Sequence, residues 1–251
     1  MVALAIAFAL AGLGSVAAQA PPETRTPNQT PPQPAALSPE KRGDIFMVRK
    51  MYREAIEAFA QAPQNDPVVL NKTGIAFHQM QQLDRARKFY ERAFKLKPTY
   101  AEAENNIGTV YYAQKNFRRA VSAYRKALAI SPSSASIHMN LGTAYFARKM
   151  EKESIAEYRT ALQLDPDVFE RHGTYGVLME ERSVEEKAKY HYALAKLYAV
   201  AGRQDLSLQY LRKALEEGFR DRKKMTQDPE FQAMRELPEF QELLTLEPRV
   251  L

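Results

Sequence analysis

The sequence predicts an all-α protein, a right-handed superhelical solenoid of about five helix-turn-helix units. Three observations lead to this prediction. Glycines recur at intervals of 34 residues, at Gly74, Gly108 and Gly142. An aromatic residue follows each glycine by three positions, at Phe77, Tyr111 and Tyr145. A proline follows each by 24, at Pro98, Pro132 and Pro166. Self-similarity with a period of roughly 20 to 50 residues is typical of repeat proteins.

The N-terminal end differs in composition from the rest of the chain. Residues 1–20, MVALAIAFALAGLGSVAAQA, carry no charge. We predict that residues 1–18 are a signal peptide cleaved before Gln19, because the apolar run is short for a membrane span and ends in small residues. A secretory signal normally begins with Lys or Arg, which this segment lacks, so an uncleaved N-terminal anchor is the alternative. The proline-rich residues 19–37 are expected to be a disordered linker.

The three complete units agree at further positions. A small residue follows each glycine by 12, a tyrosine by 16 and an alanine by 19: Ala86, Ala120 and Ser154; Tyr90, Tyr124 and Tyr158; Ala93, Ala127 and Ala161. A weaker copy starts around Gly43, and another has Ala195 in place of the glycine. The predicted units are residues 38–66, 67–100, 101–134, 135–166 and 187–220, with an insertion at about 167–186.

This pattern resembles the tetratricopeptide repeat (TPR), whose signature is Trp-x2-Leu-Gly-x2-Tyr followed by Ala-x3-Phe, Ala and Pro. Leu141-Gly142-x2-Tyr145 matches it closely, whereas the tryptophan position holds Leu70, Glu104 and His138. The resemblance covers about residues 36–220 and extends to exported bacterial TPR proteins. It implies two antiparallel helices per unit and a concave groove lined by the first helix of each unit.

Within a unit, a glycine in a helix requires an explanation. The first helix around Gly108 is expected over about 100–114 and the second over about 117–130. Glycine in a helix costs roughly 1 kcal/mol relative to alanine. We expect close packing of the two helices, with Tyr111 and Tyr124 against the glycine, to offset this cost. Helix starts are predicted at Ser38-Pro39 and Asp66-Pro67, and the three repeat prolines stop the second helices.

The insertion and the C-terminal end lie outside the regular repeat. Gly173 and Gly176 break helicity, and TYGVL between residues 174 and 178 is predicted to be a short strand or a loop. Ser183 with Glu186 is a capping box that restarts the helix. Residues 221–251 are predicted to form a helical cap on the stack. In this cap, two prolines open short helices and two phenylalanines are buried: Pro229 and Pro238, Phe231 and Phe240.

Helical periodicity gives the candidate binding surface. The face of the first helices opposite the glycine, with its flanks, carries the candidate peptide-binding residues Asn71, His78, Asn105, Asn106, Tyr112, Asn140 and Phe146. An asparagine side chain both donates and accepts hydrogen bonds, so it pairs with an extended backbone without reading sequence. The alternative is that these asparagines are solvated polar residues. The Lys-Asn-Arg clamp that holds a C-terminal carboxylate in some TPR proteins is not present at the matching positions.

Composition and motifs argue against most other functions. The absence of cysteine excludes disulfides, thiolate metal sites and a cysteine nucleophile. The net charge of +6 is spread over mixed charges, so nucleic-acid binding is not expected. The four histidines have no metal-binding spacing, and only His172, in the insertion, is a candidate for catalysis. We predict no cofactor, no metal and no enzymatic activity.

The sequence therefore predicts a non-enzymatic scaffold that binds a peptide or helix of another protein in its concave groove. The expected location is the bacterial cell envelope, with the protein periplasmic or secreted. One alternative is an envelope-organising or anchoring protein that contacts anionic lipid or cell-wall polymer through its basic surface. The other is an enzyme built around the insertion. For the scaffold, membrane contact is expected only through the N-terminal segment. The partner and the oligomeric state are not determined by the sequence.

Overall fold

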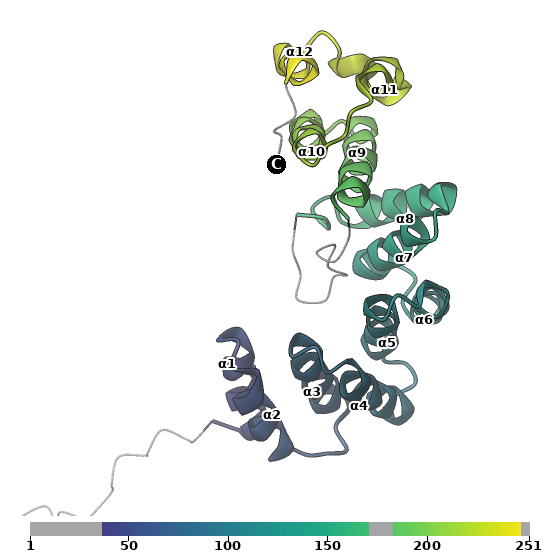
Figure 1. Cartoon of the computed structure of the whole chain (residues 1–251). Coiled ribbons are helices and arrows are strands. Elements are labelled where there is room, and N and C mark those ends of the chain that lie inside the picture. The colour runs from purple at the N-terminus through teal and green to yellow at the C-terminus, as the bar shows by residue number, and fades with distance from the viewer. Residues whose placement is uncertain (1–36, 171–182, 247–251) are drawn as a thin grey trace, which may run out of the picture. The chain divides into compact units, whose positions relative to one another are not determined.

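The computed structural model describes residues 37–170 and 183–246, and within them every regular element is a helix. Five helical hairpins follow one another along the chain (Figure 1). They are α1 (Pro39–Val48) with α2 (Tyr52–Ala60), α3 (Pro67–Gln79) with α4 (Leu83–Leu96), α5 (Ala101–Ala113) with α6 (Phe117–Ile130), α7 (Ala135–Ala147) with α8 (Glu151–Leu164), and α9 (Val184–Val200) with α10 (Gln204–Glu216). The predicted solenoid of helical hairpins is confirmed.

Each hairpin packs against the next one. The second helix of a hairpin contacts the first helix of the following hairpin, as α4 does α5 and α6 does α7. First helices such as α5 therefore have neighbours on two sides, and most of their residues are buried. Second helices such as α4 have one buried stripe and one charged face, the usual pattern of a surface helix. The core is consequently a series of linked clusters rather than a single centre.

The repeat glycines lie where a tyrosine of the partner helix crosses. A Cβ atom placed on Gly108 would lie 2.6 Å from Cε1 of Tyr124, closer than real Cβ contacts. Gly74 and Gly142 face Tyr90 and Tyr158 in the same way. All three tyrosines are buried, with at most 1% of their surface exposed. The expectation that close packing explains the glycines is confirmed for Tyr124, whereas Tyr111 is only partly buried and is not among the atoms nearest to Gly108.

Local sequence signals set the helix ends. The side chains of Ser38, Asp66 and Ser183 accept hydrogen bonds from the first-turn amides of α1, α3 and α9. In α9 this donor is the amide of Glu186, at 3.2 Å, as the predicted capping box requires. The second helices α4, α6 and α8 end two residues before their prolines. Every hairpin turn contains one residue in the left-handed region: Lys50, Gln81, Lys115, Lys149 and Gly202.

The C-terminal end forms the predicted helical elements. They are α11 (Arg222–Gln227), the 3-10 helix η1 (Pro229–Met234) and α12 (Pro238–Thr245). Pro229 and Pro238 stand at the first positions of η1 and α12. Phe231 and Phe240 are fully buried, with ring centres 5.9 Å apart. They join a core cluster with residues of α9 and α10, so these elements cover the apolar side of the last hairpin.

Candidate protein-binding site

The four predicted asparagines form a ladder of hydrogen bonds across three hairpins. Asn106 of α5 donates from Nδ2 to Oδ1 of Asn71 of α3 at 3.0 Å. Asn140 of α7 donates to Oδ1 of Asn105 of α5, also at 3.0 Å. Asn105 and Asn106 are themselves 3.4 Å apart, Nδ2 to Oδ1. The amides that the sequence analysis assigned to a ligand thus bind one another.

Burial supports this structural role for the asparagine ladder. The four side chains are 0–5% exposed, so they are neither solvated nor on an open face. The stripe was expected to be accessible because helical periodicity places it opposite the glycine. The neighbouring hairpin covers that side, and the amides satisfy each other there. Contact of these asparagines with a peptide remains a prediction.

The other three predicted residues lie in separate surroundings. His78 of α3 is partly buried, and desolvation lowers the pKa of its imidazole below the usual value. Tyr112 of α5 is buried, with its ring 5.2 Å from the ring of Phe117. Phe146 of α7 is partly buried and meets the ring of Tyr190 edge-on at 5.8 Å. Only Phe146 lines a sizeable cavity.

That cavity lies between the fourth and fifth hairpins and has a volume of about 900 Å³. It exists because α9 contacts α8 much less than α5 contacts α4 or α7 contacts α6. Its apolar lining includes Phe146, Ile155, Val184, Tyr192, Leu197 and Val200. Val184 is 55% exposed and Val200 61% exposed, so the cavity opens to solvent as a groove. We call it the α8–α9 groove.

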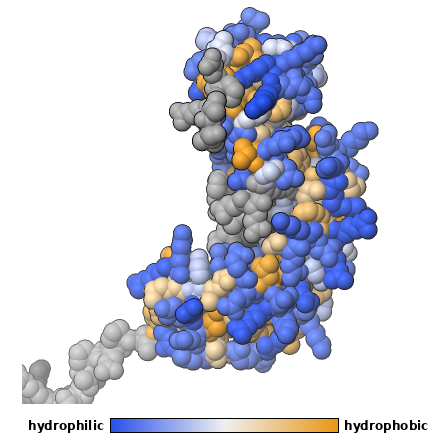
Figure 2. Space-filling view, viewed as in Figure 1, coloured by the Kyte–Doolittle hydropathy of each residue, from blue (hydrophilic) through white to orange (hydrophobic). Residues whose placement is uncertain are grey.

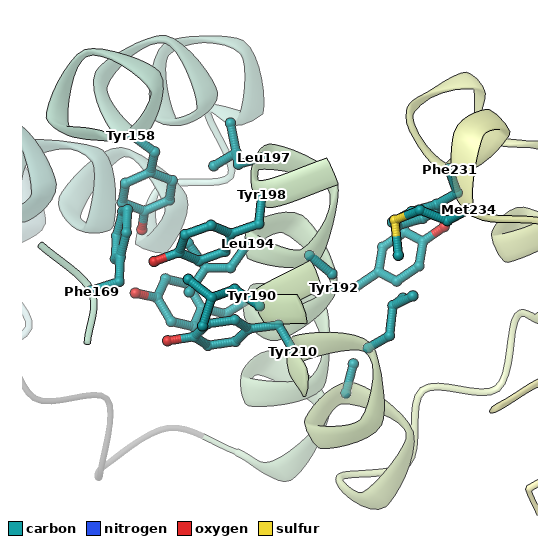
Figure 3. Close-up of a cluster of buried hydrophobic side chains, with 14 of the residues drawn as sticks. Tyr158, Phe169, Tyr190, Tyr192, Leu194, Leu197, Tyr198, Tyr210, Phe231 and Met234 are labelled. Carbon is teal, nitrogen blue, oxygen red and sulfur yellow. The ribbon is translucent and has the colours of Figure 1, made fainter. Parts of the chain in front are cut away.

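The segment after α8 explains why the two hairpins separate here. Phe169 is buried between the fourth and fifth hairpins, edge-on to Tyr158 at 5.3 Å and to Tyr198 at 6.3 Å (Figure 3). Tyr210 and Tyr198 donate hydrogen bonds to the carboxylate of the next residue, Glu170, at 2.9 and 3.4 Å. The start of the insertion therefore acts as a wedge between hairpins that would otherwise pack directly.

Charged residues line the α8–α9 groove on the side of the C-terminal elements. Lys196 of α9 forms ion pairs with Asp228 at 2.9 Å and Glu230 at 3.1 Å. Burial lowers the pKa of Lys196, but the bonds to these carboxylates outweigh it and raise the pKa overall. Tyr192 donates to Asp228 at 2.9 Å and stacks on Phe219 with ring centres 4.0 Å apart. The groove consequently has an apolar lining and one charged side whose groups are held by ion pairs and hydrogen bonds.

Sequence reasoning missed the α8–α9 groove, although one signal pointed to it. The insertion between the fourth and fifth units was visible as a longer step in the repeat. A long interruption in a compact array is often functional. The predicted TYGVL strand or loop and His172 lie outside the described residues, so the structure shows neither of them.

Residues 37–170 and 183–246 contain no group of three or more His, Asp or Glu arranged to hold a metal ion. In the same ranges, no helix is both long enough and apolar enough to cross a membrane.

Comparisons with known proteins agree with the repeat. A family model described as TPR repeat matches residues 74–115 and 108–148, and one described as Tetratricopeptide repeat matches 135–168. No curated protein sequence matches the chain.

Several solved structures are similar to part of the chain. MamA from Desulfovibrio magneticus RS-1 is 21% identical with a TM-score of 0.49, over 76% of this chain and 95% of that one. Another crystal structure of MamA is 20% identical with a TM-score of 0.48, over 70% and 93%. The first TPR domain of Spaghetti (RPAP3), bound to an HSP90 peptide, is 25% identical with a TM-score of 0.41, over 43% and 86%.

The matched residues 74–168 coincide with the hairpins in which glycine meets tyrosine at a constant offset. Sequence profile and packing thus describe the same unit, and residues 74–168 of this chain are tetratricopeptide repeats.

Proposed function

We propose that this chain is a non-enzymatic scaffold that binds an apolar segment of another protein in the α8–α9 groove. The observation that carries the proposal is the groove itself, a preformed apolar cavity of about 900 Å³ at the point where the regular stack is interrupted. Binding pockets of proteins are typically about 300–1,000 Å³, mostly apolar, with a few placed polar groups. Tetratricopeptide-repeat proteins are typically scaffolds without catalytic activity.

The lining of the groove favours an amphipathic helix as the bound segment. The apolar face of such a helix packs against Val184, Val200 and Phe146, while its polar face remains in solvent. Lys196 is already paired with both Asp228 and Glu230, so its charge is not available to a ligand, and the apolar lining contributes most to recognition.

Site-specific photo-crosslinking in cells tests this proposal. A photoreactive phenylalanine analogue at Val200 is expected to crosslink the partner, whereas the same analogue at Leu96 is not. Leu96 is a matched control because it is 52% exposed on the second hairpin and lies outside the groove. The double variant Val184→Asp/Val200→Asp should abolish capture without unfolding the protein. Equal crosslinking at Val200 and Leu96 would refute the groove as the binding site.

We propose further that the protein is exported to the bacterial cell envelope, as a periplasmic or secreted protein. The uncharged apolar residues 1–18, the small residues before Gln19 and the absence of cysteine support export. N-terminal sequencing of the protein purified from an envelope fraction should start at Gln19. A mature chain that still begins at Met1 would instead favour the uncleaved anchor.

A further inference from the structure

The turn between α1 and α2 joins exposed cations to exposed apolar side chains. Arg49, Lys50 and Arg53 are exposed, and none of them takes part in an ion pair among the residues that the structure describes. Val48 is 85% exposed, the most exposed of the large apolar side chains described, and Met51 is 37% exposed. We call these five residues the basic-apolar turn.

The acidic residues of this hairpin do not neutralise the basic-apolar turn. Glu40 and Asp44 bind Nζ of Lys72 in α3, at 2.7 and 2.8 Å. They are therefore directed toward the second hairpin. The acidic residues Glu54 and Glu57 follow on α2 after the turn. Residues 48–53, which contain the basic-apolar turn, carry three cations and no anion.

The next three hairpin turns lack this combination, and in the fifth the cation Arg203 is paired with Asp167 and Asp205. The α3–α4 turn, residues 80–82, is uncharged, and the α5–α6 turn, residues 114–116, has one cation and no large apolar residue. Two cations of the α7–α8 turn, Arg148 and Lys149, are followed closely by the exposed acids Glu151 and Glu153. Figure 2 shows hydrophilic and hydrophobic residues interspersed over the first hairpin, at the lower left of the view.

We infer that the basic-apolar turn docks the protein onto an anionic lipid surface. Charge complementarity identifies the occupant: lysine and arginine near a membrane are attracted to anionic headgroups, and each one adds to the affinity. The protruding Val48 and Met51 enter the headgroup boundary, where apolar side chains beside cations are favoured. The turn lies on the first hairpin, whereas the α8–α9 groove lies between the fourth and fifth, so one molecule has both surfaces available.

Vesicle cosedimentation of the full chain tests this inference, with phosphatidylcholine vesicles as the probe, with and without phosphatidylglycerol. The wild type is expected to partition more strongly into the anionic vesicles. This preference should weaken between about 0.01 M and 0.15 M ionic strength, over which the Debye length falls from about 30 Å to about 8 Å. Any binding through residues 1–18 contributes to both vesicle types and cancels in the comparison.

Two variants assign the preference to the turn. Arg49→Glu/Arg53→Glu should reduce partitioning into anionic vesicles by about tenfold or more. Arg118→Glu/Arg125→Glu makes the same change of charge at exposed positions of α6 and should reduce it far less. Val48→Asp should weaken binding without lowering the melting temperature, because Val48 is already exposed.

Three results would overturn the inference. One is equal partitioning into neutral and anionic vesicles. Another is an equal loss in the α6 control, which would indicate an effect of net charge alone. The third is binding of soluble polyglutamate that is as strong as binding of anionic vesicles and insensitive to Val48→Asp. That result would assign the turn to an acidic protein surface instead.

Discussion

At the scale of single residues, the glycine-tyrosine pair is the feature that recurs most faithfully. The fifth hairpin shows why the two residues depend on each other. There Ala195 replaces the glycine and Leu211 replaces the tyrosine, and both are fully buried. The small residue 12 positions later is Ser207, which donates a hydrogen bond to the carbonyl of Ala195 at 2.8 Å. A methyl group is accommodated where the crossing side chain is not aromatic.

This dependence predicts the effect of Gly108→Ala. The substitution should lower the free energy of unfolding by about 1–3 kcal/mol, because the new Cβ overlaps the Tyr124 ring. In a Tyr124→Leu background the same substitution should be neutral or stabilising by up to about 1 kcal/mol, through helix propensity. Urea unfolding of the two single variants and the double variant measures this coupling. Additive effects would contradict the packing account.

A second residue-scale feature is the buried carboxylate of Glu104. It stands at the repeat position that holds the fully buried Leu70 in the preceding hairpin. Glu104 is 5% exposed, and its ion pair with Lys126 is 3.8 Å long. Burial raises the pKa of Glu104, and the more distant Lys126 offsets this only in part. An ionised carboxylate here therefore opposes folding.

Glu104→Leu should consequently raise the free energy of unfolding by about 1–2 kcal/mol at pH 7. The gain should shrink as the pH falls below the raised folded-state pKa and should vanish below the unfolded-state pKa of a glutamate. The raised folded-state pKa means that the carboxylate opposes folding only when it is ionised in the unfolded chain. Glu102→Leu, at an exposed position of the same helix, is the control and should show no comparable gain. Unfolding midpoints at pH 7 and pH 4 separate these outcomes.

At the scale of elements, the asparagine ladder fixes how successive first helices contact each other. Its two interhelical bonds both join residues 35 apart, one more than the repeat period. Apolar contacts between hairpins tolerate small sliding, whereas paired amides have a definite register. A buried network is useful in this way only when every member has a partner.

Asn140→Ala should lower the free energy of unfolding by about 1–3 kcal/mol, because Oδ1 of Asn105 loses its donor in a buried site. Ser133→Ala, at an exposed position of the preceding loop, should change it by less than about 0.5 kcal/mol. Chemical denaturation provides the comparison. An Asn106→Ala/Asn140→Ala variant that keeps full stability but loses its partner would restore these asparagines as ligand contacts.

At the scale of the whole molecule, each end of the repeat array is expected to unfold without unfolding the other. Each hairpin of a repeat stack contacts only its neighbours, so damage at one end should not unfold the other. The C-terminal elements cover the last hairpin through the fully buried Phe231 and Phe240. At the other end, Phe59 is fully buried against Gly43 in the first hairpin.

Phe240→Ala should therefore increase hydrogen exchange in α9 and α10 while α5 and α6 keep their protection. The local cost is about 3–5 kcal/mol, the usual range for truncation of a buried phenylalanine. Phe59→Ala should produce the reverse pattern, with exchange rising in α1 and α2. Mass spectrometry of exchanged peptides reports both. A uniform rise across all hairpins would show that the array unfolds as one cooperative unit.

The sequence by itself determined the repeat, the helix starts at Ser38, Asp66 and Ser183, and the partnership of Gly108 with Tyr124. These features depend on neighbours along the chain or on a fixed offset within one hairpin, and both are visible as periodicity. Pro229 and Pro238 predicted the starts of the C-terminal helices for the same reason.

Only the tertiary structure decided what the asparagines bind and where the groove lies. Helical periodicity gives the side of a helix on which Asn106 stands, but not the neighbour that covers that side. The sequence predicted the length of the insertion. It did not predict the wedge, because Phe169 packs against the rings of Tyr158 and Tyr198, which belong to different hairpins. Contacts between hairpins arise from stacking in three dimensions, and a one-dimensional repeat does not specify them.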